Sequence, residues 1–472
     1  MPSGNGLSSV NHIVLLMLEN RSFDHMLGWL YADRGNVSPA GQPFEGLTGS
    51  ESNPQPSGQP AKVFRIEPSA PHAYFMPGAD PGEGYMATND QLYGSNAGPA
   101  TASEPATNQG FVSNYAYTLG WETREKWPIV PGTTAADIMG CFTPAALPVL
   151  SGLAAGFAVC DHWFASVPTE TLPNRAFTCA ATSQGHMDDK TRTFTAPSVF
   201  GQLESHGISW GIYGYDAQPL TKNTFTDIAG VAASHFGRFS DFRAAAAAGT
   251  LPAFTFLEPS WSSSGNSQHP NYDVALGEQF IHDVYEAVRT GPGWAQTLLV
   301  ITYDEHGGCY DHVPPPWGAT PPDNSAGEFG FDFTRFGVRV PAVLVSPLIG
   351  AGTVYRPPAG GPPLDHTSIL KTIQQRWGLP SLTARDAAAP GFGDVLTLAS
   401  PRTDDPLAGV TPPASSGPGP SAGLASHLQE IQAELISRAY PAGQSAHPGA
   451  PAGPAATSAD DFTRYIREHA DA

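Results

Sequence analysis

Three continuously apolar runs constrain the fold of this chain more than any other feature of its sequence. Residues 12–18 read HIVLLML, residues 297–303 read TLLVITY, and residues 340–347 read VPAVLVSP. Runs of this length without polar alternation are typical of strands that are buried on both faces of a parallel sheet. The sequence therefore predicts an α/β protein with a mostly parallel central sheet.

Polar residues begin where two of these predicted strands end. Glu19 and Asn20 follow the first run, and Asp304 and Glu305 follow the second; an amphipathic segment at 277–289 precedes that second run. In an open α/β sheet the ligand site lies outside the carboxyl ends of the strands. We therefore expect these four residues to converge although they are far apart in sequence.

Composition limits the class of protein. The chain has 472 residues, of which 40% are hydrophobic, so one large core with appended segments is expected. Its formal net charge of -20 disfavours nucleic acid as a partner. Its four cysteines show no CxxC spacing, which argues against a cysteine-bound structural zinc.

The N-terminal residues decide the expected location. They lack a basic region, and the apolar run at 13–18 is too short for an export signal or a membrane span. The chain is therefore expected to be cytoplasmic as the sequence stands, or else an exported protein whose leader has been removed. Its oligomeric state stays open.

Gly, Pro and Ser mark the predicted segment boundaries. Residues 1–402 are assigned to the catalytic domain, residues 403–423 to a linker rich in Pro, Gly and Ser, and residues 424–472 to a short helical extension. Two further stretches with many turn-forming residues, 36–60 and 87–110, are predicted as ordered loops around the sheet.

Two clusters of polar residues follow the predicted strands. Glu19 and Asn20 in ENRSFDH offer two hard oxygen donors to a cation such as Mg²⁺ or Ca²⁺, although for this cluster taken alone a capped turn is the better explanation. The segment YDEHGGCYDHVPPP holds Asp304, Glu305 and His312 within ten positions. So many potential ligands and proton carriers favour a site over a simple polar turn.

A third cluster, SVPTETLPNRAF, offers a hydroxyl. Thr171 lies ahead of Pro173, a residue that favours the start of a helix. Its oxygen would then lie near helix N-terminal amides, where an anion such as phosphate is stabilised. Thr169 is two residues earlier, so chemistry alone leaves both threonines open as nucleophiles.

Histidines supply a fourth group of candidates: His72, His269 and His366. A lone histidine in a loop is usually structural. A phosphate site nevertheless needs groups that offset charge on the transferred phosphoryl. His269, in the segment SQHPNYD, is the strongest of the three.

Several long motifs in register give these clusters a context. ENRSFDHMLGW, TLPNR, QHPNYDV, LLVITYDEHGGCYDHVPPP, FGVRVPAVLVSP and LDHTSILKTI together resemble the phosphoesterase family of bacterial phospholipases C, plant non-specific phospholipases C and related acid phosphatases. The resemblance covers roughly residues 10–390. One departure is Tyr272, which stands where the family commonly has a second histidine.

The resemblance implies an alkaline-phosphatase-like three-layer sandwich with a mostly parallel central sheet, and it assigns roles to the residues of the motifs. The metal ligands would be Glu19, Asn20, Thr171, Asp304 and Glu305. The catalytic groups would be Thr171 as nucleophile with His269 and His72. The substrate-binding residues would be Asn174, Arg175, Asp273, His312 and His366.

The expected reaction is hydrolysis of a glycerophospholipid to diacylglycerol and a phosphorylated head group through a phosphothreonine intermediate. It would use one divalent ion, Mg, Ca, Mn or Zn, and the expected partners are a phospholipid or small phosphoester and at most the surface of a membrane. An acid phosphatase of the same family is the alternative, and a non-catalytic lipid-binding or phosphate-binding protein is a more remote one.

Overall fold

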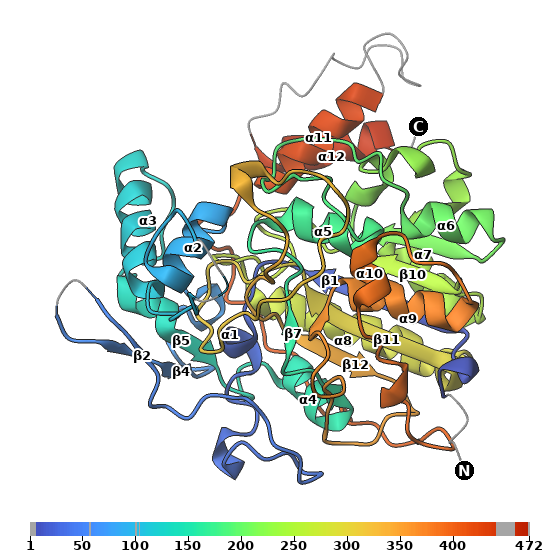
Figure 1. Cartoon of the computed structure of the whole chain (residues 1–472), viewed down its shortest axis with the longest axis horizontal. Helices are drawn as coiled ribbons and strands as arrows, with labels where there is room; N and C mark the ends of the chain where they lie inside the picture. The colour runs from blue at the N-terminus through green and yellow to red at the C-terminus, as the bar shows by residue number, and fades with distance from the viewer. Residues whose placement is uncertain (1–5, 56–57, 100–101, 103, 440–457, 471–472) are drawn as a thin grey trace.

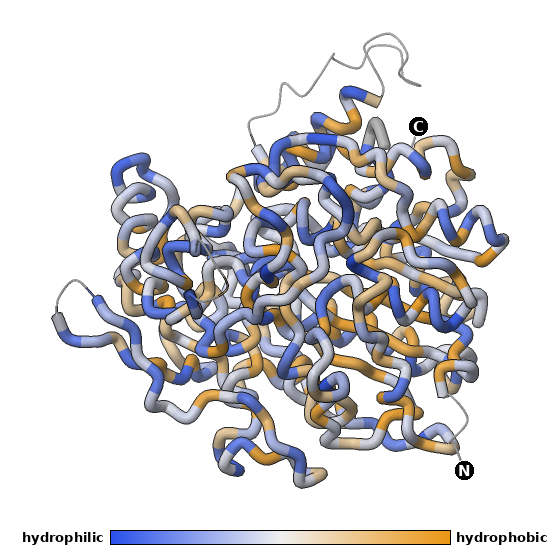
Figure 2. Tube along the Cα trace, viewed as in Figure 1, coloured by the Kyte–Doolittle hydropathy of each residue, from blue (hydrophilic) through white to orange (hydrophobic). Residues whose placement is uncertain are grey.

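The computed structural model describes residues 6–55, 58–99, 102, 104–439 and 458–470, and its centre is one eight-stranded sheet (Figure 1). Figure 2 shows that the most apolar stretches of the chain gather in this central region. Across the sheet the strands follow the order β13 (Thr353–Val354), β6 (Ala158–Val159), β12 (Ala342–Val345), β11 (Thr297–Tyr303), β1 (His12–Leu18), β10 (Phe254–Leu257), β8 (Trp210–Gly214) and β9 (Phe236–Arg238).

The predicted sheet is confirmed, with one difference in strand direction. Strands β1 and β11 coincide with the two apolar runs that end in acids, and they pair in parallel. The third run forms β12, which is antiparallel to both of its neighbours, β11 and β6. An apolar run reports burial on both faces, which β12 has, but it carries no information on strand direction.

Helices cover both faces of the sheet, so the core has three layers (Figure 1). One layer holds α4 (Pro148–Gly156), α7 (Phe239–Ala248) and α8 (Val274–Thr290), in which α8 contacts both α4 and α7. The other holds α5 (Thr171–Ala180), α6 (Val199–Ser205), α9 (Thr367–Trp377) and α10 (Ala384–Ala388). The amphipathic segment predicted at 277–289 is the body of α8. A two-stranded pair, β7 (Trp163–Phe164) with β14 (Leu364–Asp365), leads into this second layer.

A smaller lobe stands beside the sheet and has an apolar core of its own (Figure 1). Its elements are α1 (Phe23–Leu27), β2 (Ser52–Asn53), β3 (Ala61–Lys62), β4 (Phe64–Ile66), α2 (Tyr85–Tyr93), α3 (Phe111–Glu125) and β5 (Gly140–Phe142). The loop expected at 87–110 is wrong over its first residues, which belong to α2. That helix buries the polar side chains of Thr88, Asn89 and Gln91, so it lacks the apolar stripe that reveals a helix in sequence.

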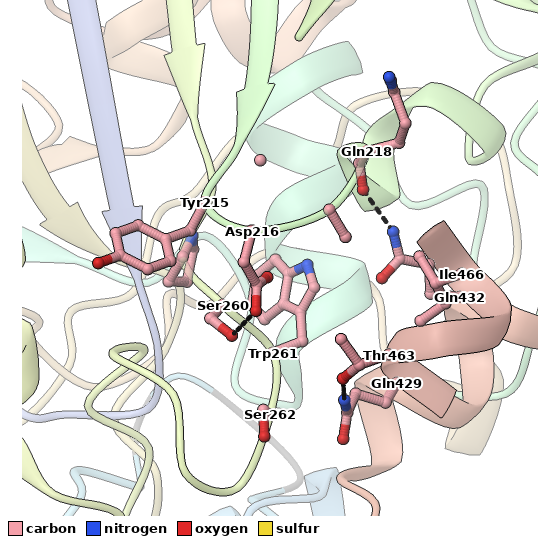
Figure 3. A pocket seen from close by; sticks show the side chains of 13 residues that line it. Tyr215, Asp216, Gln218, Ser260, Trp261, Ser262, Gln429, Gln432, Thr463 and Ile466 are labelled. Carbon is pink, nitrogen blue, oxygen red and sulfur yellow. Dashed lines mark hydrogen bonds between the residues drawn. The ribbon is translucent and has the colours of Figure 1, made fainter. Parts of the chain in front are cut away.

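The two helices predicted near the C-terminus are confirmed as α11 (His427–Ala439) and α12 (Ala459–Ala470). They pack against each other and against the body of the protein. Figure 3 shows the junction, a cavity of about 10 Å³ where Gln432 donates a hydrogen bond to the carbonyl oxygen of Gln218 at 2.6 Å and Gln429 donates one to Thr463 at 3.0 Å.

Residues 403–423 also contact the body. The hydroxyl of Tyr285 donates to Asp405, and Asn271 donates to Ser421. The expected division into a domain, a linker and an extension stays a prediction. Among the described helices, none combines the length and the apolar character that crossing a bilayer requires.

Candidate active site

The carboxyl ends of β1 and β11 meet at one edge of the sheet. In this parallel pair Leu18 lies opposite Tyr303, and acids follow both residues directly. We refer to Glu19, Asp304 and Glu305 as the strand-end acids; each is at most 3% exposed. Their predicted convergence is confirmed, whereas their roles stay predictions.

Asp304 is held rigidly from several sides. Its Oδ1 accepts hydrogen bonds from the backbone N–H groups of Asn20 at 2.9 Å and Glu305 at 2.8 Å. The Nε of Arg175 donates to its Oδ2 at 2.9 Å, and Nε2 of His366 lies 2.6 Å from its backbone oxygen. Arg175 and His366, which were expected to bind substrate, therefore lie behind Asp304 and orient it.

Thr171 is the first residue of α5, and its side chain faces the strand ends. Its hydroxyl donates to Oδ1 of Asn20 at 3.1 Å, and the next amide, of Leu172, donates to Asp189 at 2.7 Å. The helix begins at Thr171, two residues before Pro173. The predicted setting of a hydroxyl at a helix N-terminus is therefore confirmed, and the partial positive charge of that terminus favours an anion beside Thr171.

Thr169 differs from Thr171 in what its hydroxyl contacts. It is buried and donates to the backbone oxygen of Met187 at 2.7 Å. Thr169 is absent from the lining of the cavity described below, whereas Thr171 is part of it. The geometry favours Thr171 of the two candidate nucleophiles.

Glu305 has a carboxylate that the described residues leave partly uncompensated. Its Oε2 accepts from the N–H of Gly307 at 2.7 Å, but its buried Oε1 has no hydrogen-bond partner among them. Burial, together with the negative charges of Glu83 and Asp304, raises the pKa of Glu305 well above its usual value. A Cβ at residue 307 would lie 2.0 Å from the backbone oxygen of Asn20, so this turn requires glycine.

His306 lies between Gln91 and Glu305. Its Nε2 lies 2.7 Å from Oε1 of Gln91, and its Nδ1 lies 3.1 Å from Oε2 of Glu305. Burial lowers the pKa of His306 to about 3, so the ring is neutral and the proton on Nε2 serves Gln91. Nδ1 of His306 then faces Oε2 of Glu305 as an acceptor, so this contact is a hydrogen bond when the carboxyl of Glu305 carries a proton.

These observations fit a divalent cation at the strand ends. A hard cation such as Mg²⁺ or Ca²⁺ takes carboxylate, amide and hydroxyl oxygens, and the buried Oε1 of Glu305 is such an oxygen without a partner. The set Glu19, Asn20, Thr171, Asp304 and Glu305 stays a prediction. Among the described residues, the groups of three acids or histidines whose ligand atoms lie within 4.8 Å of one another are Asp24, Asp311 and His312, and Asp80, Glu83 and His269.

Two acids next to His269 were not predicted. Asp80, Glu83 and His269 place one ligand atom each within 4.8 Å of one another, and Oε1 of Glu83 lies 3.2 Å from Nε2 of His269. Burial disfavours the charged ring, but the coulombic attraction of Asp80 and Glu83 prevails and raises the pKa of His269 well above its usual value. His269 is therefore a cation that also carries a transferable proton.

Two further unpredicted acids lie beside Thr171. Glu170 precedes it, and Asp189 accepts from the amide that follows it. Burial raises the pKa of each to about 8, and each is also raised by neighbouring carboxylates. More acidic groups therefore surround Thr171 than the motifs alone indicated, and the raised pKa of these two favours their protonated form at neutral pH.

Of the predicted site residues, the lining of the cavity described below contains Glu19, Thr171 and His269, and His72, Asp273 and Asn174 are among those outside it. His72 is exposed and precedes a short 3₁₀ turn. Asp273 caps α8, where it accepts from the N–H of Ala275 at 2.9 Å. Asn174 is buried and bonds the backbone of the turn before Thr171, so it shapes that turn.

His312 belongs to a separate group around Arg339, which we name the Arg339 cluster and which comprises Asp24, Asp311, His312 and Arg339. The guanidinium donates to Asp24 and to Asp311 at 2.9 Å each, and Nδ1 of His312 lies 2.6 Å from Oδ2 of Asp24. Burial opposes ionisation of Asp24, but Arg339 and His312 outweigh it and lower the pKa of Asp24. For Asp311 burial prevails and raises the pKa to about 6.

Thr171 opens into a cavity of about 550 Å³. Its floor includes Glu19, Thr171 and His269, and its walls come from the lobe and from the segment that leads into α11. Trp121 and Leu428 represent these two walls. The cavity is large enough for a head group together with part of a glycerol backbone.

A family model matches most of the chain. The model described as the phosphoesterase family matches residues 10–380, and the chain belongs to that family. It is a hydrolase of the class that acts on phosphoric ester bonds. The predicted family and enzyme class are confirmed.

Curated relatives include plant and bacterial phospholipases C. Non-specific phospholipase C6 of Arabidopsis thaliana is 37% identical over 453 residues, covering 92% of this chain and 80% of the relative. Phospholipase C B of Mycobacterium tuberculosis is 29% identical over 453 residues, covering 85% and 80%.

Among solved structures, an alkaline phosphatase superfamily protein from Vibrio parahaemolyticus overlaps with a TM-score of 0.32 at 12% identity, over 52% of this chain and 64% of that one. The α/β assignment therefore rests on the sheet and its helical layers.

Proposed function

We propose that this chain is a metal-dependent phospholipase C that cleaves glycerophospholipids into diacylglycerol and a phosphorylated head group, with Thr171 as the nucleophile. One observation carries the proposal. The hydroxyl of Thr171 lies at a helix N-terminus, 3.1 Å from Oδ1 of Asn20, and lines a cavity together with Glu19, while Oε1 of Glu305 is buried at the neighbouring strand end without a hydrogen-bond partner among the described residues. The family and the names of the relatives support the class of reaction.

Different residues would bind the phosphate, attack phosphorus and protonate the leaving group. The N-terminus of α5 attracts the phosphate, and Asn20 orients the Thr171 hydroxyl. The Thr171 hydroxyl gives its proton to water in the cavity, and attack by its Oγ on phosphorus forms a phosphothreonine that still carries the head group while the bond to the glycerol oxygen breaks. Protonated His269 donates its proton to that departing oxygen. The neutral ring then takes a proton from an attacking water, whose oxygen displaces Oγ from phosphorus; Oγ regains a proton from water, and the phosphorylated head group leaves.

The cation is assigned to Glu19, Asn20, Thr171, Asp304 and Glu305. When bound, a divalent ion at these oxygens would lower the pKa of the nearby hydroxyl and offset charge on the phosphoryl group. Arg175 and His366 keep Asp304 in place for that task.

A phosphomonoesterase of the same family would use the same groups. The cavity favours the diesterase, because a volume of about 550 Å³ exceeds what a bare phosphate requires. Phosphate alone would be served by a smaller pocket.

A product assay tests the proposal. Phosphatidylcholine and p-nitrophenyl phosphate are supplied separately, with and without chelator, and diacylglycerol and phosphate release are measured. Diacylglycerol that forms faster than nitrophenol, is lost on chelation and returns with Mg, Ca, Mn or Zn is the expected result. Preference for p-nitrophenyl phosphate would assign the acid phosphatase activity instead, and no turnover of either ester would leave a binding protein.

A further inference from the structure

Large apolar side chains are exposed around the mouth of the cavity. Trp121 is 43% exposed, Trp127 is 51% exposed, and their rings stack with centroids 6.4 Å apart. Leu424, 39% exposed, lies on the opposite wall, in the segment before α11. All three line the cavity, so two distant parts of the chain expose apolar groups at one opening.

Helix α3 extends this surface away from the body. Tyr117 is 71% exposed and precedes Trp121 by four residues, so both side chains lie on the same face of the helix. Figure 1 shows α3 at one end of the molecule, well removed from the central sheet. We name Tyr117, Trp121, Trp127 and Leu424 the aromatic rim.

Two cations accompany the rim in a protein of strongly negative charge. Arg124 and Lys126 lie between the two tryptophans in the sequence and are exposed. Within the described part of the chain, neither forms an ion pair. Long basic side chains beside aromatic rings suit a surface of phosphate groups above apolar chains, because the stem rests on apolar material while the charge reaches the phosphate.

Tryptophan and tyrosine prefer the boundary between lipid and water, since their rings are apolar and their N–H or O–H stays hydrated. We propose that the aromatic rim docks onto the interface of a zwitterionic phospholipid bilayer and brings the cavity mouth over a head group; this inference rests on the proposed function. The net charge of -20 directs the choice, because it repels anionic bilayers while Arg124 and Lys126 contact individual lipid phosphates.

The test measures binding of the full chain to phosphatidylcholine vesicles by flotation. Binding uses the Thr171→Ala background, so that the vesicles persist. Replacing both rings, Trp121→Ser with Trp127→Ser, should weaken partition roughly tenfold or more. The control, Phe329→Ser, removes a ring that is 54% exposed but lies outside the rim, and it should bind as the parent does.

Turnover separates this inference from the proposed function. With Thr171 intact, Tyr117→Ser, a rim substitution outside the cavity lining, should lose activity on vesicles in proportion to its loss of vesicle binding and keep it on a water-soluble, short-chain phosphatidylcholine below its micellar concentration. Failure of both substrates in the wild-type chain would refute the proposed function. Normal turnover of the soluble ester, with vesicle binding that is absent or unchanged by the rim substitutions, would refute the docking surface alone.

The same variants also test whether a second copy of this chain, and not a bilayer, covers the aromatic rim. A second copy of this chain seated on the rim would give a dimer that the Trp121→Ser and Trp127→Ser substitutions dissociate, which sedimentation would reveal. That result, with vesicle binding unaffected, would overturn the membrane assignment. A monomer whose tryptophan emission shifts to shorter wavelength on adding vesicles, and does so less in the rim variant, is the expected outcome.

Discussion

The strand-end acids and the Arg339 cluster are both buried groups of acidic residues, yet their charges are balanced in opposite ways. In the Arg339 cluster a guanidinium bonds both Asp24 and Asp311, and the charge it supplies lowers the pKa of Asp24. At the strand ends Glu305 has an oxygen without a partner among the described residues and a pKa well above its usual value. Unsatisfied charge, more than acidity itself, marks the group suited to a cation.

The two groups also illustrate different uses of buried charge. The Arg339 cluster joins α1 to the segment after β11. Its carboxylates accept hydrogen bonds from the guanidinium of Arg339 and from the backbone of His312. The strand-end acids lie near the helix terminus of Thr171, and we expect a bound cation to contact the free oxygen of Glu305. If this contrast is correct, substitutions in the two groups should separate chemistry from stability.

The largest effect is expected at Thr171, because the strand-end acids serve chemistry only if a nucleophile lies beside them. Thr171→Ala should reduce turnover roughly 10⁴-fold or more, as loss of a covalent route does, with little change in folding. Thr171→Ser should retain part of the activity because it keeps the hydroxyl. Steady-state turnover of phosphatidylcholine measures both variants.

Thr169→Ala is the matched control and should be mild, since that hydroxyl only bonds a backbone oxygen. Rapid quenching with a phosphate-labelled substrate should trap label on the peptide that contains Thr171. Label on a histidine, or on Thr169, would contradict the assignment of the nucleophile while keeping the phosphoesterase class.

The next largest effect is expected for Glu305→Gln, which removes a charge but keeps the shape. Turnover should fall roughly a thousandfold and bound divalent ion should be lost, because a carboxylate that compensates the cation is gone. Elemental analysis and turnover measure the two losses. In chelator this variant should be at least as stable as the parent, because the mutual repulsion of buried carboxylates is relieved. A variant that keeps its ion would contradict the assignment.

Asp24→Asn should show the reverse pattern. Removing this carboxylate leaves the buried guanidinium of Arg339 partly uncompensated, which should lower the free energy of unfolding by about 3 kcal/mol. Denaturant unfolding measures this loss, and the metal content of the folded fraction should stay at the parent value. Loss of the ion without loss of stability would mean that the Arg339 cluster is itself a metal site.

The smallest effect concerns Glu278, a buried carboxylate outside both groups, which accepts from the N–H groups of Val149 and Leu150. Burial raises its pKa from 4.5 to about 7. The native state thus binds more protons than the unfolded state between those pH values, so the contribution of Glu278 to stability is present below about pH 4.5 and is lost as pH rises through 7. The loss amounts to at most about 3 kcal/mol.

Glu278→Gln should remove this pH dependence, because the amide does not titrate. Unfolding free energies from pH 4.5 to 7.5 in the parent and the variant test the point. An unchanged slope would show that backbone donors compensate Glu278 as fully as Arg339 compensates Asp24.

The sequence predicted the parts of the site that follow long apolar runs. Glu19 and Asp304 come directly after β1 and β11, whose apolar pattern reveals buried strands, so their meeting follows from sheet geometry. Asp80, Glu83 and Asp189 were missed because they lie in irregular segments with no periodic signal. Only tertiary packing brings them to Thr171. For Asp80 and Glu83, the sequence signal was the presence of acids among glycines and prolines in PGADPGEG.

The direction of β12 and the partners of the histidines were also beyond the sequence. Burial makes a strand apolar whichever way it runs, so β12 gave no warning that it is antiparallel. His312 belongs to the motif YDEHGGCYDHVPPP, but its ring contacts Asp24. His366 belongs to LDHTSILKTI, and its ring contacts the backbone oxygen of Asp304. The motifs indicated that both rings lie near the predicted site. The hydrogen-bond partner of each ring could be identified only from the structure.

The packing of α11 has a consequence for any shortened form of the chain. Leu428 and Leu435 on α11 share a cluster with Leu172, the residue next to Thr171, and with Trp261. Deleting α11 would expose this cluster to water and remove the apolar support of the first turn of α5. The orientation of the Thr171 hydroxyl should therefore depend on a helix that is remote from it in sequence.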